Sequence, residues 1–198
     1  MSELLIATKN RNKAHEFAAA LNDKQLQIKT LLDYPNFPEI AETGLTFSEN
    51  AHLKVAAAIK ELNIPTLADD SGLMVDYLHG QPGVRSARYA GDHNDAANNA
   101  KLLAELAGVP LEQRQAQFVT TIVYCNPNTN QEIEVVGQLT GQILPVPRGN
   151  NGFGYDPLFY VPSLNKSLAQ LTMEQKNRIS HRGQAIKKFV AEYQKFGY

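Results

Sequence analysis

Two adjacent carboxylates, Asp69 and Asp70, follow a short apolar segment and precede Ser71 and Gly72. Adjacent carboxylates repel each other, so such a pair normally needs a cation or hydrogen bonds as compensation. One or two carboxylates plus substrate phosphate oxygens suit Mg2+. Because strand side chains alternate between faces, we expect different roles: one aspartate binds metal or activates water, and the other supports the loop. Sites in α/β sheets collect at strand ends, which favours function, but an ordinary turn ending the strand is the alternative.

Residues 8–13 read Thr-Lys-Asn-Arg-Asn-Lys and contain three cations and no acid. They follow the apolar run 4–7 and lead into residues 14–21, whose apolar positions recur at helical spacing. The N-terminus of a helix offers free N–H groups and the positive end of the helix dipole, so it can bind an anion. The glycines and the Gly-Lys-Ser/Thr ending of a Walker A motif are missing. An anion site and a solvated loop with surface lysines are equal alternatives.

A glycine-rich segment, residues 149–156, reads Gly-Asn-Asn-Gly-Phe-Gly-Tyr-Asp. Its glycine order is the reverse of the dinucleotide fingerprint, which excludes that motif. Phe153 stands between two glycines, so the backbone can approach a ligand while the ring stacks on a nucleobase. The alternative is a glycine-rich hairpin with Phe153 tucked into the core.

A second basic cluster lies between residues 176 and 188, where no Asp or Glu occurs. It consists of Lys176, Arg178, Arg182, Lys187 and Lys188, with His181 among them. A positive helix face usually contacts only solvent. Two basic clusters together with a carboxylate cluster fit a more specific interpretation, a polyphosphate held by cations with Mg2+ between it and the carboxylates.

The composition excludes several classes of protein. The chain of 198 residues has 19 Lys and Arg against 20 Asp and Glu, a formal net charge of -1, which argues against a general nucleic-acid coat protein. Its single cysteine, Cys125, excludes an internal disulfide and is interpreted as a small buried hydrophobe. No apolar run reaches the ~18 residues that span a bilayer, and none resembles a signal-peptide core. We therefore expect a cytoplasmic protein with neither a membrane nor a nucleic acid as partner.

The elements that must position these groups alternate between strand and helix, which is typical of an α/β fold. The predicted strands cover residues 4–7, 26–32, 66–68, 73–78, 116–124 and 132–144, and the predicted helices cover 14–21, 46–64, 94–106 and 172–196. Thr46 and Glu49 form a capping box at the start of the second helix. We expect one domain, 1–198, with a second lobe at approximately 110–145 and a ligand cleft between the lobes.

Together these motifs resemble the ITPase-like (Ham1/RdgB-type) family of non-canonical purine nucleoside triphosphate pyrophosphatases. The matching segments are 8–13, 42–51, 67–73, 82–91, 152–159 and 179–183. One such segment would be a weak signal, but six in order along nearly the whole chain are specific. The resemblance implies a two-lobed, mixed-sheet α/β fold with a central cleft, usually a homodimer. It also implies Mg2+-dependent hydrolysis of inosine and xanthosine triphosphates and their deoxy forms to the monophosphate and pyrophosphate.

The resemblance further implies which residues form the site. Asp70 would accept the proton of the attacking water and bind metal. The implied substrate-binding residues are Thr8, Lys9, Asn10, Arg11, Asn12, Lys13, Lys54, Ser71, Phe153, Gly154, Tyr155, Asp156, Lys176, His181 and Arg182. Some members carry two adjacent acids before Thr-Gly, where this chain has Ala41-Glu42. The second metal ligand would therefore be Glu42 or water.

Three other functions compete with this interpretation. A nucleotide sensor without catalysis would not need the intact Asp69-Asp70-Ser71-Gly72 motif. A Maf-like enzyme acting on pyrimidine or modified nucleotides is disfavoured by residues 153–156, which resemble a loop for 6-keto purines. An RNA-binding protein using the basic C-terminal helix is disfavoured because the chain has no broad basic excess and no interleaved aromatic residues there.

Overall fold

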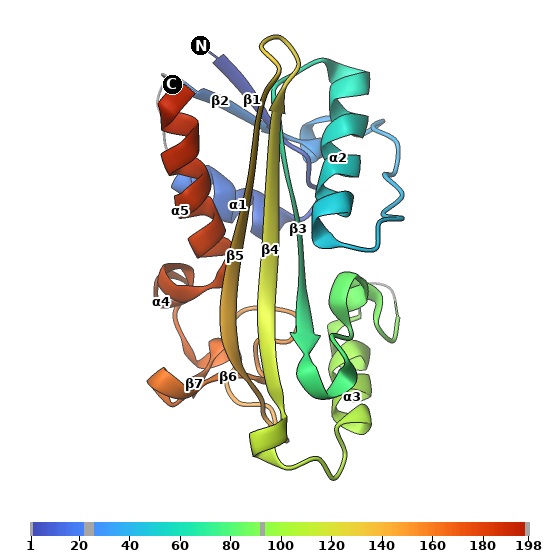
Figure 1. Ribbon diagram of the computed structural model, residues 1–198, viewed down its shortest axis with the longest axis vertical. Coiled ribbons are helices and arrows are strands. Elements are labelled where there is room, and N and C mark those ends of the chain that lie inside the picture. Colours follow the sequence, from blue (N-terminus) through green and yellow to red (C-terminus); the bar gives the residue numbers. More distant parts are fainter. Residues whose placement is uncertain (1, 22–25, 92–93, 197–198) are drawn as a thin grey trace. The chain divides into compact units, whose positions relative to one another are not determined.

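The computed structural model describes residues 2–21, 26–91 and 94–196 (Figure 1). Its α-helices are α1 (Arg11–Ala20), α2 (Phe47–Leu62), α3 (Asp95–Glu105), α4 (Met173–Ile179) and α5 (His181–Tyr193). Its strands are β1 (Ser2–Ile6), β2 (Leu26–Thr30), β3 (Thr66–Val75), β4 (Gln115–Asn126), β5 (Gln131–Ile143), β6 (Phe159–Val161) and β7 (Lys166–Ser167). These strands form one sheet of order β2-β1-β3-β4-β5-β6-β7. β1 pairs in parallel with β2 and β3, whereas β6 pairs antiparallel with β5 and β7, which confirms the predicted mixed-sheet α/β class.

The chain divides into two compact units. The first unit comprises Met1–Asp70, Thr120–Gly137 and Ala185–Tyr198, and the second comprises Ser71–Val119 and Gln138–Gln184. The long strands β3, β4 and β5 each contribute residues to both units. For this reason the lobe expected at approximately 110–145 divides between the two units.

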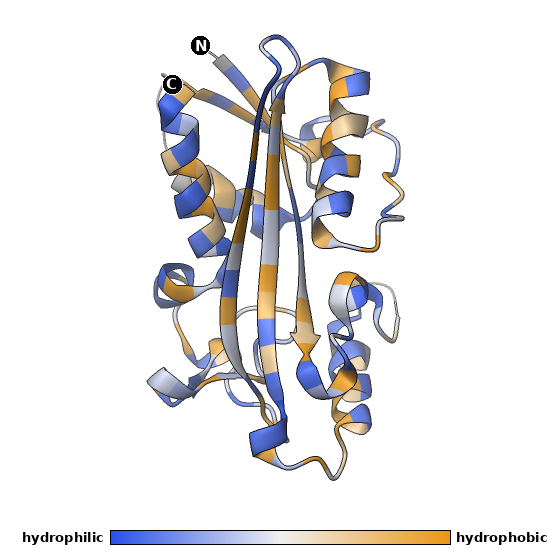
Figure 2. Cartoon of the chain, in the orientation of Figure 1, coloured by the Kyte–Doolittle hydropathy of each residue, from blue (hydrophilic) through white to orange (hydrophobic). Residues whose placement is uncertain are grey.

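The first unit buries both faces of its parallel strands, as expected for strands covered by helices on each side. Leu4 and Ile6 of β1 pack in one apolar cluster with Phe17 of α1 and Phe189 of α5. Leu5 of β1 and Ala7 just after it pack in a second cluster with Val55 of α2. Figure 1 shows α1 and α5 on one side of these strands and α2 on the other. Figure 2 shows hydrophobic and hydrophilic positions interspersed along α2 and α5, as amphipathic covering helices require.

Cys125 belongs to the second of these clusters. It is half-buried there, and burial raises the pKa of its thiol to about 11. A thiol with so high a pKa is protonated at neutral pH and behaves as a small apolar group.

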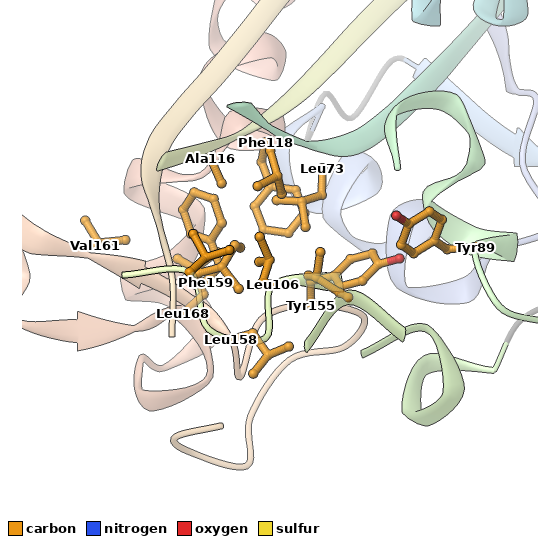
Figure 3. Packing of buried hydrophobic residues seen from close by; sticks show 14 of the residues in the cluster. Leu73, Tyr89, Leu106, Ala116, Phe118, Tyr155, Leu158, Phe159, Val161 and Leu168 are labelled. Carbon is orange, nitrogen blue, oxygen red and sulfur yellow. The ribbon is translucent and has the colours of Figure 1, made fainter. Parts of the chain in front are cut away.

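The second unit has its own apolar core, part of which is shown in Figure 3. Leu102 and Leu106 join this core from the α3 segment, and both are fully buried. The rings of Phe118 and Phe159 have centroids 4.6 Å apart. Tyr155, near the end of the glycine-rich segment 149–156, is only 4% exposed and packs in the same core. The core therefore anchors one end of the glycine-rich segment.

Local sequence signals place the starts of the four predicted helices to within three residues. The predicted capping box at Thr46 is confirmed: Thr46 Oγ1 accepts a hydrogen bond from the Glu49 backbone N–H at 3.1 Å, and Glu49 Oε2 accepts from the Thr46 N–H at 3.3 Å. Residues 8–13 do lie at the start of a helix, because α1 begins at Arg11 with Asn10 as its N-cap. None of the helices in the described ranges combines the length and the apolar run that crossing a membrane requires.

Two predicted elements are wrong. Residues 66–68 and 73–78 were expected to be separate strands, but β3 is continuous from Thr66 to Val75, so the aspartates lie within a strand and form no turn. The helix expected over 172–196 is interrupted at Ser180, which has an extended backbone, so that α4 and α5 are separate. A side chain at Gly183 of α5 would place its Cβ 1.9 Å from the Asn177 carbonyl oxygen, so the two helices approach closely at this break.

Candidate active site

Asp70 of β3 is a buried carboxylate in the first unit, and α2 supplies its partners. Its Oδ1 accepts a hydrogen bond from Lys54 Nζ at 3.0 Å, and its Oδ2 accepts from Asn50 Nδ2 at 3.1 Å. The same Lys54 ammonium lies 2.8 Å from Glu42 Oε1 and donates to the Asp69 carbonyl oxygen at 2.9 Å. Asn50 and Lys54 are four residues apart and so share one face of α2. The predicted site residues Glu42, Lys54 and Asp70 are thus brought together.

Asp69 has a different partner from its neighbour. Its Oδ2 lies 2.9 Å from Lys13 Nζ of α1, and the Asp69 side chain is only 1% exposed. Side chains alternate along a strand, so the two aspartates contact helices on opposite faces of the sheet, α1 for Asp69 and α2 for Asp70. The two aspartates therefore have different partners, and their different roles stay a prediction.

The charges of this group do not balance. Three carboxylates, from Glu42, Asp69 and Asp70, accompany the two ammonium groups of Lys13 and Lys54. Burial raises the pKa of Asp70 and Glu42 raises it further, although Lys54 and Lys13 oppose the shift. Burial alone would lower the pKa of Lys54, but the carboxylates, with Asp70 first, raise it above its ordinary value. The group therefore keeps Lys54 protonated, makes Asp70 more basic and carries an excess of negative charge.

The donor set fits a divalent cation with few protein ligands. Among the described residues, no three His, Cys, Asp or Glu side chains gather as a complete metal site. Glu42 and Asp70 nevertheless each place one oxygen within 3.0 Å of the same Lys54 ammonium, so the two carboxylates lie close enough to share a cation beside it. Mg2+ is commonly held by one or two carboxylates, with water and phosphate oxygens in the remaining positions.

The basic segment 8–13 is organised around the start of α1. Asn10 Oδ1 accepts hydrogen bonds from the backbone N–H groups of Asn12 at 2.9 Å and Lys13 at 3.2 Å. Thr8 Oγ1 accepts from the Asn10 N–H at 3.1 Å, and Lys9 Nζ donates to the Phe37 carbonyl oxygen at 3.1 Å. The Asn10 side-chain oxygen is therefore committed to capping, which leaves its amide nitrogen as the group suited to an anion. Arg11 and Asn12 are exposed at the same helix end.

In the second unit, Phe153 is accompanied by two buried cations. Lys176 Nζ lies 4.6 Å from the centroid of the Phe153 ring, and Arg182 Cζ lies 6.0 Å from it, both within cation–π range. Lys176 Nζ is also 2.6 Å from Asp156 Oδ2, which accepts a second hydrogen bond from the Phe153 N–H at 3.0 Å. Burial raises the pKa of Asp156, although Lys176 opposes the shift. Phe153 is half-buried beside these cations and does not join the apolar core.

Several other predicted contact residues are buried among protein groups. His181 is 5% exposed and stacks on Phe118 with centroids 4.7 Å apart. Tyr155 donates its hydroxyl to the Ser86 carbonyl oxygen at 2.9 Å. Arg182 donates to Ser71 Oγ at 3.3 Å, which brings those two predicted residues together.

The residues of the predicted basic cluster 176–188 make separate contacts and do not form one continuous basic face. Arg178 pairs with Glu174 at 2.5 Å on an exposed helix surface, and Lys188 donates to the Val136 carbonyl oxygen at 2.6 Å. Lys176 and Arg182 of this cluster lie over the Phe153 ring.

Sequence reasoning missed three residues of these groups. Asn50 binds Asp70, and Asp95 and Asn99 of α3 both bind the backbone of Gly154. Each residue has a polar partner four positions away on its helix, Asn50 with Lys54 and Asp95 with Asn99. Such a pair of polar residues one turn apart is the signal that could have pointed to them.

Gly152→Ala is expected to destabilise the protein by at least about 3 kcal/mol. Gly152 has a φ of +79°, and a Cβ there would lie 2.0 Å from Asp156 Oδ2, the oxygen that binds Lys176. Gly154→Ala is the matched control, because Gly154 has a φ of +60° but no atom within 4 Å of its Cβ position. It should cost only about 1–2 kcal/mol of backbone strain. Chemical denaturation measures both, and equal losses would contradict the steric argument.

Fold and site together define an α/β protein with a buried acid–lysine group in one unit and an aromatic loop flanked by buried cations in the other. The chain belongs to the Ham1 family, whose model matches residues 4–192. It is 56% identical over 190 residues to the dITP/XTP pyrophosphatase of Lactiplantibacillus plantarum, covering 96% of this chain and 94% of that protein. It is 51% identical over 195 residues to the dITP/XTP pyrophosphatase of Geobacillus kaustophilus, covering 98% of this chain and 95% of that protein.

Solved structures agree with this assignment. The Staphylococcus aureus Ham1 protein superimposes with a TM-score of 0.89 at 43% identity, covering 98% of each chain. A HAM1 protein from Coxiella burnetii gives a TM-score of 0.91 at 40% identity, covering 98% of this chain and 100% of that one. These comparisons confirm the resemblance that the sequence motifs indicated.

Proposed function

We propose that this protein hydrolyses non-canonical purine nucleoside triphosphates, dITP and ITP, XTP and dXTP, to the monophosphate and pyrophosphate, and so cleanses the nucleotide pool. The observation that carries the proposal is the buried Asp70 carboxylate, held between Lys54 and Asn50. The dITP/XTP pyrophosphatases that share half or more of its residues support it.

In this proposal Asp70 is the proton acceptor. Lys54 and Asn50 fix the direction of its two oxygens, and burial makes its carboxylate more basic than an exposed aspartate. It orients the water that attacks the α-phosphorus and takes its proton. A well-placed general base typically contributes ~10²–10⁴-fold to the rate.

Glu42 and Asp70 are the residues that would hold Mg2+, since both carboxylates lie beside the same Lys54 ammonium and hence close to each other. When bound, the ion would offset the charge of the phosphates and of the departing pyrophosphate. Lys54 itself has a protonated ammonium that faces both carboxylates and can bind a phosphate oxygen beside them.

The phosphates of the substrate bind the basic segment 8–13 in this proposal. The N-terminus of α1 supplies the positive end of the helix dipole, and Thr8, Lys9, Arg11 and Asn12 surround it. The Asn10 amide nitrogen and the Lys13 ammonium are its main contacts. The triphosphate carries about four negative charges, so these cations also help water approach it.

The purine base stacks on Phe153 in this proposal, with residues 153–156 as the base loop. Asp156 acts through its neighbours, because its Oδ2 binds both the Phe153 N–H and Lys176. Arg182 donates to the 6-keto oxygen. Ser71 Oγ holds the Arg182 guanidinium by accepting its hydrogen bond, and His181 directly precedes Arg182 in the chain. Adenine presents a donor at this position, so a buried donor opposite it would be left unpaired, which can cost several kcal/mol.

Two broader statements also belong to the proposal. The family resemblance implies that the protein is a homodimer. Its substrates arise in the nucleotide pool, so we place it in the cytoplasm, with neither nucleic acid nor membrane as partner.

Pyrophosphate release from dITP, XTP, dATP and dGTP, with and without Mg2+, tests the proposed activity. We expect Mg2+-dependent release from dITP and XTP, with kcat/KM at least about 100-fold lower for dATP, given the cost of the unpaired donor. Tight dITP binding without pyrophosphate release would instead indicate a sensor. A preference for pyrimidine or modified nucleotides would indicate a Maf-like activity.

A further inference from the structure

The segment around Phe153 is intrinsically free to change shape. Gly152 and Gly154, on either side of Phe153, have φ angles of +79° and +60°. Glycine reaches such angles as readily as negative ones, so the peptide groups next to it rotate at little cost. The direction of the Phe153 ring must therefore be fixed by contacts from outside these three residues.

Helix α3 supplies two of those contacts to a single residue. Asp95 Oδ2 accepts a hydrogen bond from the Gly154 N–H at 2.7 Å, and Asn99 Nδ2 donates to the Gly154 carbonyl oxygen at 2.9 Å. Asp95 and Asn99 are one turn apart and so project from the same face of α3. Because the N–H and the carbonyl belong to successive peptide groups, the pair fixes both peptide planes that flank Gly154.

The remaining peptide group next to Phe153 is fixed from the other side. Asp156 Oδ2 accepts the Phe153 N–H at 3.0 Å, and the Tyr155 hydroxyl ties the end of the segment to Ser86. Gly154 has no other side-chain hydrogen bond among the described residues. Asp95 and Asn99 therefore supply the side-chain contacts to Gly154, in addition to the backbone hydrogen bond from the Asp156 N–H to the Phe153 carbonyl oxygen at 3.2 Å.

The chemistry of Asn99 argues against a role in stability alone. Its Oδ1 is buried and has no hydrogen-bond partner in the part of the chain that the structure describes. A buried oxygen without a partner costs free energy, and an alanine at this position would avoid that cost. Losing the Asn99 side chain should therefore change the stability little, while it releases the Gly154 carbonyl.

We infer that Asp95 and Asn99 are positioning residues that hold Phe153 in the orientation that binds the purine base. The inference rests on the proposed function and deepens it, since it names the residues that hold the base loop in its binding orientation. Neither side chain needs to touch the substrate. Both act through Gly154, and their loss should weaken the binding of the base while the group around Asp70 keeps its activity.

The test measures KM and kcat for dITP in Asn99→Ala and Asp95→Ala. Each variant should raise KM about tenfold, the effect of losing roughly one hydrogen bond to a charged or buried group, and leave kcat within about twofold. Asp95→Asn should restore KM, because the asparagine oxygen still accepts from the Gly154 N–H. The inhibition constant of inorganic tripolyphosphate, which has no base, should not change in any variant.

Asn94→Ala is the matched control on the same helix. Asn94 caps α3 by accepting from the Ala97 N–H, whereas the side-chain hydrogen bonds to Gly154 among the described residues come from Asp95 and Asn99, so the loss of Asn94 weakens the helix start without releasing the base loop. An equal rise in KM for Asn94→Ala would overturn the inference, as would an unchanged KM in Asn99→Ala and Asp95→Ala or a parallel rise in the tripolyphosphate inhibition constant. If the wild type releases no pyrophosphate, the proposed activity fails, and the same comparison of dissociation constants for dITP by calorimetry still decides the role of Asp95 and Asn99.

Discussion

Asp70→Asn is expected to lower kcat for dITP by roughly 10²–10⁴-fold and to leave the dissociation constant for dITP near the wild-type value. The substitution keeps the size of the side chain and removes its ability to take a proton. The expected pattern, a loss in kcat without a loss in binding, identifies a group that acts in the chemical step. Single-turnover kinetics and calorimetry with dITP measure the two quantities separately.

The fold should survive this substitution. Lys54 keeps its ion pair with Glu42 at 2.8 Å and its hydrogen bond to the Asp69 carbonyl at 2.9 Å. The new amide cannot satisfy both partners, because Asn50 and Lys54 are both donors to Asp70, and the Asn50 oxygen already accepts from the Gly44 N–H at 2.8 Å. Some local loosening is therefore expected, and thermal denaturation shows whether it is small.

Asp69→Asn is the matched control for this prediction. It makes the same chemical change one residue away, on the side chain that faces Lys13 of α1. We expect its kcat to stay within about tenfold of the wild type, because a residue that only orders another group lies outside the chemical step. Equal losses of kcat in the two variants, or near-wild-type turnover in Asp70→Asn, would refute the role of Asp70 as proton acceptor.

Features that depend on neighbouring residues were predictable from the sequence. The capping box of Thr46 and Glu49 and the helix start within residues 8–13 are set by contacts over two or three positions. The local pattern contains the whole cause in these cases. The family resemblance added Glu42 and Lys54, which no local pattern marks as a pair.

Features that depend on distant residues were not predictable. Two aspartates in the middle of a strand contradict local strand preference, so we expected the strand to end there. Strand β3 continues through the two aspartates because Lys13 and Lys54, far from them in the sequence, compensate their charges. Likewise, the contact of Asn99 with Gly154 spans 55 positions.

Lys13→Ala is expected to raise the KM for dITP by roughly 10–100-fold, the effect of losing one hydrogen bond between an ammonium and a phosphate oxygen. It should also destabilise the fold by up to about 3–5 kcal/mol, because Asp69, with a side chain 1% exposed, loses its ammonium partner. The two effects must be separated before the rise in KM is assigned to the phosphates.

The double variant Lys13→Ala/Asp69→Asn separates them. Neutralising Asp69 removes the buried charge that Lys13 compensates, so the stability should return toward that of the wild type. If Lys13 binds the triphosphate, KM stays high in the double variant, because the ammonium is still missing. If Lys13 serves only as the partner of Asp69, KM recovers together with the stability, which would refute a role in phosphate binding.

Lys60→Ala controls for the change in net charge. Lys60 is an exposed residue in the last turn of α2, and its loss removes one positive charge, as Lys13→Ala does. Long-range attraction of a triphosphate depends on the total charge and is screened within about 10 Å at 0.1 M salt. A KM that rises in Lys13→Ala and in the double variant, but not in Lys60→Ala, therefore requires a direct contact between Lys13 and the phosphates. Equal rises in KM in all three variants would indicate that residues 8–13 act only as a charged surface, without direct contact with the phosphates.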